Sequence, residues 1–355
     1  MINDEQIKAM DETAAVAVGD LRVTMVPSPE DSILQSESEI ELHVEELPMP
    51  PIVIYHGNCA DGFCAALAFW LKHGNAMEYY PGVYQEAPPN VEGRIVYMVD
   101  FSYKRDVVLE MLEKAEKVYF IDHHKTAIED LADLSDIGSE FLQPNFMAYT
   151  DLNRSGAMLA WDFVYNTVWN GFGFERNRVN LEPEYREAPK LFHYVQDRDL
   201  WQKKLPRTNE FSANLFSYNY DFVEWAGIMS DVESVAGFTH FCMAGEAILR
   251  KQQKDINELL KVTLRYFPLA HEGDGVPTAN MPYTLASEAC HQLLQDHPEA
   301  PFAACYWDTE THRIFSLRSE EGREDVSEIA KLYGGGGHRN AAGFRVTRDN
   351  PLAQM

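Results

Sequence analysis

The sequence predicts an α/β protein with two α/β domains, an N-terminal domain built on a parallel sheet and a smaller C-terminal domain built on a mixed sheet. Two observations lead to this class. Short apolar runs rich in β-branched residues alternate with helical stretches, which is typical of parallel strands joined by crossover helices. The length of 355 residues also exceeds a usual single domain of roughly 100–200 residues.

The first strand is expected at residues 52–56, where an apolar run precedes a polar turn and a helix at 63–72. Residues 95–100 and 118–122 form two further runs of this kind, and a helix at 106–115 separates them. Buried parallel strands are short continuous apolar runs, so these three segments are predicted to belong to one parallel sheet.

Helices at 155–168 and 188–195 are expected to cover this sheet, and a long helical stretch at 226–264 is expected to connect the two domains. After two strand-like runs, the second domain is predicted to contain a helix near 285–294, strands near 302–307 and 313–317, a helix near 326–332 and a strand at 342–346. The predicted boundaries are 51–225 for the first domain, 226–264 for the connector and 265–355 for the second domain.

Residues 1–50 differ in composition from the rest and are predicted to form a partly ordered acidic extension. They contain twelve acidic and two basic residues, and therefore carry −10 of the net charge of −26. Pro48, Pro50 and Pro51 end the segment, because proline cannot continue a helix. A solvated arm that improves solubility is the simplest interpretation. The alternatives are recruitment of a partner and inhibition of the site by mimicry of nucleic acid.

Composition also limits the partners. The excess of 56 acidic over 30 basic residues disfavours long duplex DNA and anionic membranes, whose binding relies on a broad basic surface. No run approaches the roughly 18 apolar residues of a membrane helix, and the first residues lack the features of a signal peptide. The five cysteines have no metal-clip spacing, and their odd number disfavours a disulfide framework. We therefore expect a cytoplasmic protein with no membrane partner.

Polar residues end each of the three strands of the predicted parallel sheet. These residues are His56, Asp100 and the run Asp122-His123-His124. Ligands of open α/β sheets bind beyond the carboxyl ends of the strands, so the three endings are expected to meet in one crevice. Carboxylates and neutral histidines, here joined by Asp61, are suitable ligands for divalent cations. A lone Asp at a strand end is more often a helix cap, but repetition at successive strands favours a metal centre.

A glycine-rich loop is the second chemical signal. Residues 334–337 are four glycines, and they precede His338 and Arg339 between an expected helix and an expected strand. Glycines lack a Cβ, so backbone N–H groups can approach an anion closely, and His338 and Arg339 add donors suited to phosphate. Such a loop alone is more often a flexible hinge, but its place between two regular elements favours an ordered anion site.

Together these motifs resemble the DHH phosphoesterases that carry a DHH-associated domain, a family that includes single-strand exonucleases, nano-RNases and cyclic-dinucleotide phosphodiesterases. The matching strings stand in the family's order and cover roughly residues 52–347. They are IVIYHGNCADGFCAALAFW, IVYMVDFSY, VYFIDHHKT, YTDLNRSGAMLAW, YVQDRDLW and YGGGGHRNAAGF. The resemblance implies a DHH domain, a DHH-associated domain and a dinuclear centre, usually of manganese, in the cleft between them.

The resemblance also implies metal ligands. Asp100 would bridge two ions, with His56 on one ion and the remaining ligands on the other. These remaining ligands would be Asp61, His123 and Asp197. Asp199, two residues further along, competes for the last place, and the apolar helix residues before Asp197 favour the earlier position.

The catalytic and substrate-binding residues follow from the same resemblance. Asp100 and Asp122 would be catalytic together with His124, which would contact the substrate phosphate. Asp122 would hold His123 in the tautomer that binds metal. The resemblance implies that Gly336, Gly337, His338 and Arg339 bind substrate. Arg154 and Ser155 are further candidates, and a surface salt bridge is the alternative role of Arg154.

One position departs from the family's pattern. Family members usually have an aspartate two residues before the Asp-Gly pair, and this chain has Cys59 there. A thiolate is a further candidate ligand, but it favours softer ions such as zinc. Alternatively, Asn58 or water fills the gap in a weakened site. The resemblance still makes two Mn²⁺ ions the leading expectation, and Cys59 makes Zn²⁺ an alternative beside Mg²⁺.

The expected function is that of a metal-dependent phosphodiesterase or exonuclease-type hydrolase. It would hydrolyse short single-stranded oligonucleotides or small, including cyclic, dinucleotides by means of a metal-activated water. The alternatives are a pyrophosphatase or polyphosphatase and a catalytically degenerate protein that binds nucleotides. The sequence leaves open the preference for RNA or DNA, the cleavage polarity and the formation of a homo-oligomer.

Overall fold

The computed structural model describes residues 15–18, 21–27, 40–46, 49–84, 86–169, 174–176, 186–269 and 275–355. The chain divides into two compact units, Met1–Pro50 and Pro51–Met355, and each is considered by itself. Among the described residues, none of the helices is long and apolar enough to cross a membrane.

The first unit contains an antiparallel sheet with the strand order β1-β2-β3. The strands are β1 (Ala15–Val18), β2 (Leu21–Pro27) and β3 (Ile40–Glu46). The composition predicts a partly ordered acidic extension here, and none of these strands was expected. The signal was present in residues 21–27, where apolar and polar residues alternate with a period of two, as in a strand with one buried face.

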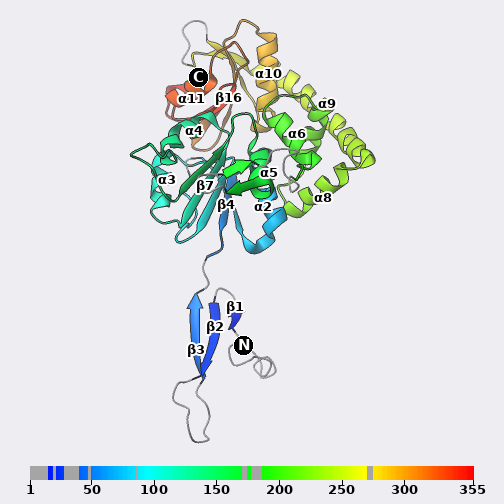
Figure 1. Cartoon of the computed structure of the whole chain (residues 1–355). Helices are drawn as coiled ribbons and strands as arrows, with labels where there is room; N and C mark the ends of the chain where they lie inside the picture. The colour runs from blue at the N-terminus through cyan, green and yellow to red at the C-terminus, as the bar shows by residue number, and fades with distance from the viewer. Residues whose placement is uncertain are drawn as a thin grey trace, which may run out of the picture. The chain divides into compact units, whose positions relative to one another are not determined.

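The larger unit begins with a five-stranded parallel sheet of order β5-β4-β6-β7-β8, which confirms the predicted parallel sheet (Figure 1). Its strands are β4 (Ile52–His56), β5 (Glu78–Gly82), β6 (Ile95–Val99), β7 (Lys117–Asp122) and β8 (Phe146–Thr150). The two edge strands, β5 and β8, were not predicted. Strand β5 contains Pro81, and proline is tolerated only at such an edge.

The strand order reverses between β4 and β6. From β4 the chain continues to β5 on one side, whereas β6, β7 and β8 follow one another on the other side. In open α/β sheets this switch point is where ligands bind, beyond the carboxyl ends of the strands. The topology therefore places a binding crevice where His56 ends β4 and Asp100 follows β6.

Helices cover both faces of this sheet. Successive side chains of a strand point to opposite faces, so each strand contributes apolar residues to both layers of helices. Val53 packs with the cluster that contains α2 and α5, whereas Ile52 and Ile54 pack with α3 and α4 (Figure 1). The helices of this part are α2 (Ala60–His73), α3 (Arg105–Leu112), α4 (Lys125–Leu131), α5 (Gly156–Asn166), α6 (Lys190–Asp199) and α7 (Thr208–Leu215). A short hairpin of β9 (Thr167–Trp169) and β10 (Phe174–Arg176) follows α5.

The long, mainly helical stretch expected at 226–264 is helical, and it falls on two successive helices. These are α8 (Phe222–Val232) and α9 (Val235–Thr263). Ser234 separates them, because its side chain accepts a hydrogen bond from the N–H of Gly237 and caps α9. Trp225 and Val232 of α8 are buried in the core of the parallel-sheet region, so α9 alone spans the distance to the second sheet.

The second sheet is mixed and has six strands in the order β11-β12-β13-β14-β16-β15, as the sequence predicts for a smaller mixed-sheet domain. Only β12 and β13 are parallel among its neighbouring pairs. The strands are β11 (Leu264–Phe267), β12 (Val276–Asn280), β13 (Ala303–Asp308), β14 (His312–Arg318), β15 (Gly336–His338) and β16 (Ala341–Thr347). Helices α10 (Ala286–Asp296) and α11 (Val326–Leu332) pack on it. The described part of the chain also contains short 3₁₀ helices at Gly74–Ala76, Ala132–Leu134, Tyr283–Leu285 and Pro351–Ala353.

The packing of α7 on α9 leads to a stability prediction. A Cβ added at Gly245 of α9 would lie 1.8 Å from the carbonyl oxygen of Glu210 in α7. We expect Gly245→Ala to lower the free energy of unfolding by about 1–3 kcal/mol, because the helices must separate. Gly227→Ala in α8 is the matched control: no described atom lies within 4 Å of its added Cβ, and removing an exposed helical glycine stabilises by about 0.5–1 kcal/mol. Urea unfolding measures both, and equal effects would contradict the packing.

A cross-strand ion pair in the second sheet leads to a prediction on pH. Hydrogen bonds from Arg313 and Arg348 lower the pKa of Asp308 to about 2, against the effect of partial burial. A lowered carboxyl pKa stabilises the fold above the unfolded value of 3.8, and this contribution disappears as the pH falls from 3.8 towards 2. We expect Asp308→Asn to unfold at lower urea concentration than the unmodified protein at pH 7, and the difference to vanish near pH 2. A difference that persists at pH 2 would contradict the assignment.

Candidate metal centre

The residues that end the central strands meet at the switch point of the parallel sheet. His56 ends β4, Asp100 follows β6, and Asp122 ends β7 with His123 and His124 directly after it. Asp100 has a φ of 55°, which is in the left-handed region that non-glycine residues rarely adopt. Such strain is concentrated at functional sites, and here it turns the Asp100 side chain towards the histidines.

Two glycines allow helices to approach this point closely. A Cβ at Gly62 would lie 2.5 Å from the carbonyl oxygen of His56, so the start of α2 can pack on the end of β4 only with glycine there. A Cβ at Gly156 would lie 2.4 Å from the Cβ of Asp100. The Asp-Gly and Ser-Gly pairs of the sequence are thus explained by close packing, which brings Asp61 to the cluster.

Asp61 also has a structural role. Its carboxylate accepts hydrogen bonds from the backbone N–H groups of Gly156, at 2.6 Å, and Ala157, at 3.2 Å. These groups begin α5, where unpaired N–H groups and the helix dipole favour a negative charge. The helix therefore fixes the orientation of Asp61 independently of any metal.

Among the described residues, four overlapping groups of potential ligands lie at this point. Two of them contain both His123 and His124, and the other two are the candidates for separate cations. In the first group, which contains His56, Cys59 and Asp100, the Asp100 Oδ2 lies 3.6 Å from both His56 Nδ1 and Cys59 Sγ. In the second group, which contains Asp61, His123 and Asp199, the His123 Nε2 lies 3.6 Å from an oxygen of each carboxylate. His123 Nε2 is also 3.0 Å from Asp100 Oδ1, so Asp100 joins the two groups.

The electrostatics of this cluster reflect buried negative charge. Burial and the neighbouring carboxylates of Asp199 and Asp100 raise the pKa of Asp61 well above its usual value. Burial also acts to raise the pKa of Asp100, yet His123 and His56 beside it hold that pKa well below the usual value. Burial acts to lower the pKa of His123, but its hydrogen bond to Asp100 and the other carboxylates raise that pKa to about 10. Positive charge is therefore strongly favoured here.

The donor set fits divalent cations. The buried atoms His56 Nδ1, His123 Nδ1 and Asp122 Oδ2 have no hydrogen-bond partner among the described residues. An unpaired buried polar atom destabilises a fold, so such atoms in one cluster need an explanation. Carboxylate oxygens and imidazole nitrogens are ligands of manganese, magnesium and zinc, and a cation would satisfy part of the cluster.

Asp122 orients a different histidine from the one predicted. Its Oδ1 lies 2.7 Å from His124 Nδ1 and accepts a hydrogen bond from the backbone N–H of His123. The expectation that Asp122 fixes the His123 ring is therefore wrong, because the carboxylate reaches the ring two residues ahead rather than the next one. Asp122 thus positions His124, while Asp100 contacts the ring of His123.

The structure also corrects the choice between Asp197 and Asp199. Asp199 faces His123, whereas the Asp197 carboxylate accepts hydrogen bonds from the backbone N–H groups of Lys204 and Leu205 and from the Thr208 hydroxyl. Residues two apart on a helix point in different directions, so only one of them can face the cluster. The apolar residues before Asp197 indicate the buried face of α6, and Asp197 lies on that face. The same pattern therefore predicts a structural role for Asp197 rather than a place among the ligands.

The glycine-rich segment of the second sheet meets the DHH segment directly. Its residues Gly336, Gly337 and His338 form β15, and the Gly337 N–H donates a hydrogen bond to Thr126 Oγ1 at 3.1 Å. The ring of His338 stacks on that of His124, with centroids 4.4 Å apart and an interplanar angle of 22°. Thr126 was not identified from the sequence, although it belongs to the string VYFIDHHKT.

Ion pairs hold the two sheet regions together beside this contact. Lys125 lies 2.9 Å from Asp325 and 3.2 Å from Glu328, which begin α11. Lys331 of the same helix lies 2.8 Å from Glu129 of α4. The residue directly after the DHH motif therefore joins the two regions.

Three of the predicted substrate-binding residues have other partners. Arg154 pairs with buried Asp162 at 2.6 Å, and Arg339 donates to the carbonyl oxygen of Arg323 and lies 3.5 Å from Glu321. Ser155 is fully buried, and its backbone N–H donates a hydrogen bond to the side-chain oxygen of Gln196. The structure thus places Gly336, Gly337 and His338 at the cluster, but it does not direct Arg154, Ser155 and Arg339 to an open surface beside it.

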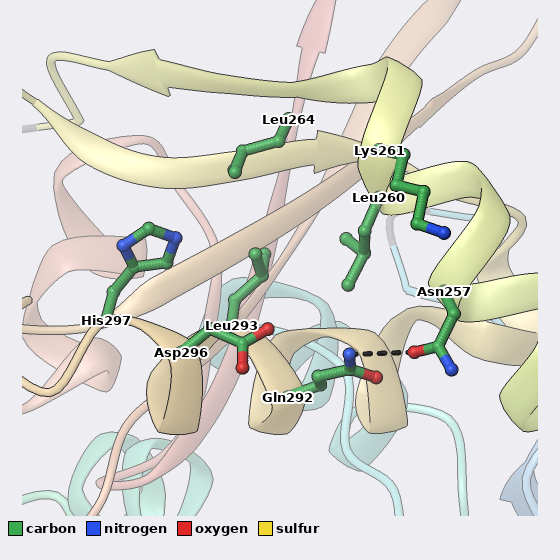
Figure 2. Close-up of a pocket in the computed structure, with 8 residues that line it drawn as sticks. All are labelled: Asn257, Leu260, Lys261, Leu264, Gln292, Leu293, Asp296 and His297. Atoms are coloured by element: carbon green, nitrogen blue, oxygen red, sulfur yellow. Dashed lines mark hydrogen bonds between the residues drawn. The ribbon is translucent and has the colours of Figure 1, made fainter.

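A separate groove of about 410 Å³ lies between α9 and α10, and Figure 2 shows its side chains. None of the candidate ligands lines it. The lining residues are Asn257, Leu260, Lys261, Leu264, Gln292, Leu293, Asp296 and His297.

The two aspartates of α6 can be separated by experiment. We expect Asp199→Asn to weaken Mn²⁺ binding by about tenfold or more, because a ligand is lost, with little change in melting temperature. Asp197→Asn should instead lower the free energy of unfolding by about 1.5–3 kcal/mol, because hydrogen bonds to a charged group are lost. Titration calorimetry and thermal unfolding measure the two effects. Lost binding with unchanged stability in Asp197→Asn would restore the original assignment.

Comparison with known proteins gives distant similarities. No family model matches the chain. It is 28% identical over 312 residues to uncharacterized protein R106 of Acanthamoeba polyphaga mimivirus, and the match covers 82% of this chain and 66% of that protein, which is less than two thirds.

Three solved structures resemble the chain at low identity. The first is the DHH domain of a protein described as a member of a family of ribosomal proteins, with 15% identity, a TM-score of 0.48 and coverage of 84% of this chain and 83% of that one. The second is the pGpG-specific phosphodiesterase PggH from Vibrio cholerae, with 12% identity, a TM-score of 0.40 and coverage of 84% and 93%. The third is an exopolyphosphatase-related protein from Bacteroides fragilis, with 12% identity, a TM-score of 0.37 and coverage of 86% and 89%. All three TM-scores are below 0.5. In its motifs and in the arrangement of their side chains, the chain resembles the DHH phosphoesterases that carry a DHH-associated domain.

Proposed function

We propose that the chain is a metal-dependent phosphoesterase that hydrolyses phosphodiester bonds in short single-stranded oligonucleotides or dinucleotides. One observation carries the proposal: two groups of ligands meet at the switch point of the parallel sheet, beside His338 of the second sheet. Asp100 belongs to the first group and lies 3.0 Å from His123 of the second. A pair of cations a few ångströms apart suits displacement at phosphorus, because both the attacking and the leaving oxygen need stabilisation.

The proposed cofactors are two Mn²⁺ ions, with Mg²⁺ or Zn²⁺ as alternatives. His56, Cys59 and Asp100 would hold one cation, and Asp61, Asp100, His123 and Asp199 would hold the other. When bound, such cations activate water as a nucleophile and neutralise charge on a phosphoryl group.

His124 is proposed to act on the substrate itself. Burial acts to lower its pKa, but the Asp122 carboxylate raises that pKa above the ordinary value. A protonated His124 can donate a hydrogen bond to a phosphoryl oxygen as negative charge develops there. Burial and the neighbouring rings of His124 and His123 hold the pKa of His338 well below its usual value, so His338 would contribute a neutral imidazole.

The substrate class is inferred from charge and from the glycine-rich segment. Residues 51–355 carry −16 of the net charge, since −26 less the −10 of residues 1–50 leaves −16, and this disfavours a long polyanion. A short nucleotide needs few basic contacts when cations and histidines bind its phosphate. Long duplex DNA and membranes are therefore not proposed as partners.

The proposal predicts that catalysis depends on Asp100. We expect Asp100→Ala to reduce Mn²⁺-dependent cleavage of di- to pentanucleotides by about a thousandfold or more, because several kcal/mol of transition-state stabilisation depend on the cations. Chelation should abolish activity in the unmodified protein, and added Mn²⁺ should restore it. Exposed Glu92 gives the control, since Glu92→Ala should retain full activity.

The same assay separates the alternatives when the panel includes pyrophosphate, polyphosphate and cyclic dinucleotides, each with Mn²⁺, Mg²⁺ and Zn²⁺. Turnover confined to pyrophosphate or polyphosphate would replace the proposed substrate class. Tight nucleotide binding without product under every condition would indicate a binding protein. Unchanged turnover in Asp100→Ala would refute the metal centre.

A further inference from the structure

We propose that the group of His56, Cys59 and Asp100 binds a thiophilic divalent cation such as Zn²⁺ through the Cys59 thiolate, while the group of Asp61, His123 and Asp199 binds a hard cation. The centre would then hold two different metals. This inference rests on the proposed function, since it requires cations at the cluster.

The position of Cys59 in the backbone supports a role as a ligand. It occupies the residue before α2 with an extended backbone, where Ser, Thr, Asp or Asn would cap the helix. Its side chain makes no capping hydrogen bond within the described part of the chain. Instead, its Sγ lies 3.6 Å from Asp100 Oδ2, so the thiol turns away from the helix and towards the cluster.

The other cysteines have a different environment. Cys64 and Cys242 are buried in the apolar cluster beside the parallel sheet, and Cys290 and Cys305 are buried in an apolar cluster of the second sheet. Cys59 is only half-buried and belongs to neither cluster. Packing therefore accounts for the other four thiols but not for Cys59.

The two groups differ in chemical softness. The first group offers one sulfur, one imidazole and one carboxylate, which is a set typical of zinc, and three protein ligands leave a fourth position open for water or substrate. The second group offers two carboxylates and one imidazole, which suits manganese or magnesium better.

The geometry of the first group needs little change on binding. Its three potential ligand atoms lie within 4.8 Å of one another. His56 Nδ1 is buried and has no hydrogen-bond partner among the described residues, so a cation there would break no existing hydrogen bond of this atom. The close packing at Gly62 fixes the spacing between the end of β4 and the start of α2, and hence between His56 and Cys59.

Cobalt tests this directly, because thiolate ligation gives an absorption band in the near ultraviolet, whereas cobalt bound only by oxygen and nitrogen lacks it. The full-length protein is freed of metal by chelation and titrated with Co²⁺. We expect the thiolate band in the unmodified protein and its loss in Cys59→Ser and Cys59→Asp. Cys64→Ala, inside the helix that Cys59 precedes, is the matched control and should keep the band. Circular dichroism and thermal unfolding confirm that each variant is folded.

Metal selectivity gives a second readout that does not depend on absorption. After dialysis against equimolar Zn²⁺ and Mn²⁺, the ratio of bound zinc to bound manganese should fall by about tenfold or more in Cys59→Asp, because a carboxylate replaces the soft ligand. An unchanged ratio would overturn the inference.

The outcomes distinguish this inference from the proposed function. Cobalt that binds without a thiolate band in the unmodified protein would overturn the role of Cys59 and leave a metal-dependent phosphoesterase intact. A band that persists in Cys59→Ser but disappears in Cys64→Ala would also overturn it. Absence of any bound Co²⁺, Zn²⁺ or Mn²⁺ would refute the metal centre and with it both proposals.

Discussion

Negative charge held out of water is the constraint on which the rest of this protein depends. Asp61, Asp100 and Asp122 are each at most 2% exposed and lie within one cluster. Isolated buried carboxylates are very unfavourable unless positive charge or hydrogen bonds compensate them. Here helix α5 compensates Asp61, and histidines compensate the other two. A fold that maintains such an arrangement is suited to binding cations, since each cation replaces a proton or an unsatisfied contact.

The backbone of the region is organised around this charge. The left-handed conformation of Asp100 is unfavourable in itself, and the glycines at positions 62 and 156, which allow close packing, lose more conformational freedom on folding than other residues would. Each feature brings a ligand closer to its neighbours. These unfavourable backbone features occur together at the switch point of the sheet, whereas both faces of the sheet pack as ordinary apolar cores.

Much of this arrangement could be predicted from the sequence, because apolar periodicity identifies the central strands and their last residues locate the crevice. The edge strands β5 and β8 were missed, since edge positions tolerate residues that weaken the strand pattern. The strands of residues 15–46 were missed because the acidic composition dominated the interpretation. The distinction between Asp197 and Asp199 requires the direction of each side chain on α6, and the pairing of Asp122 with His124 depends on a local turn. Spacing along the chain specifies neither.

The ring contact between His124 and His338 has a consequence for access. Centroids 4.4 Å apart leave no space between the rings for a phosphate, so a substrate reaches both rings only at their edges unless the rings separate. The contacts opposing this separation include ion pairs of exposed or half-exposed side chains around Lys125 and Lys331. Such pairs contribute about 0–1 kcal/mol each and are screened by salt. Raising the ionic strength therefore weakens this junction, while the buried ligands of the cluster, which salt screens much less, keep their interactions.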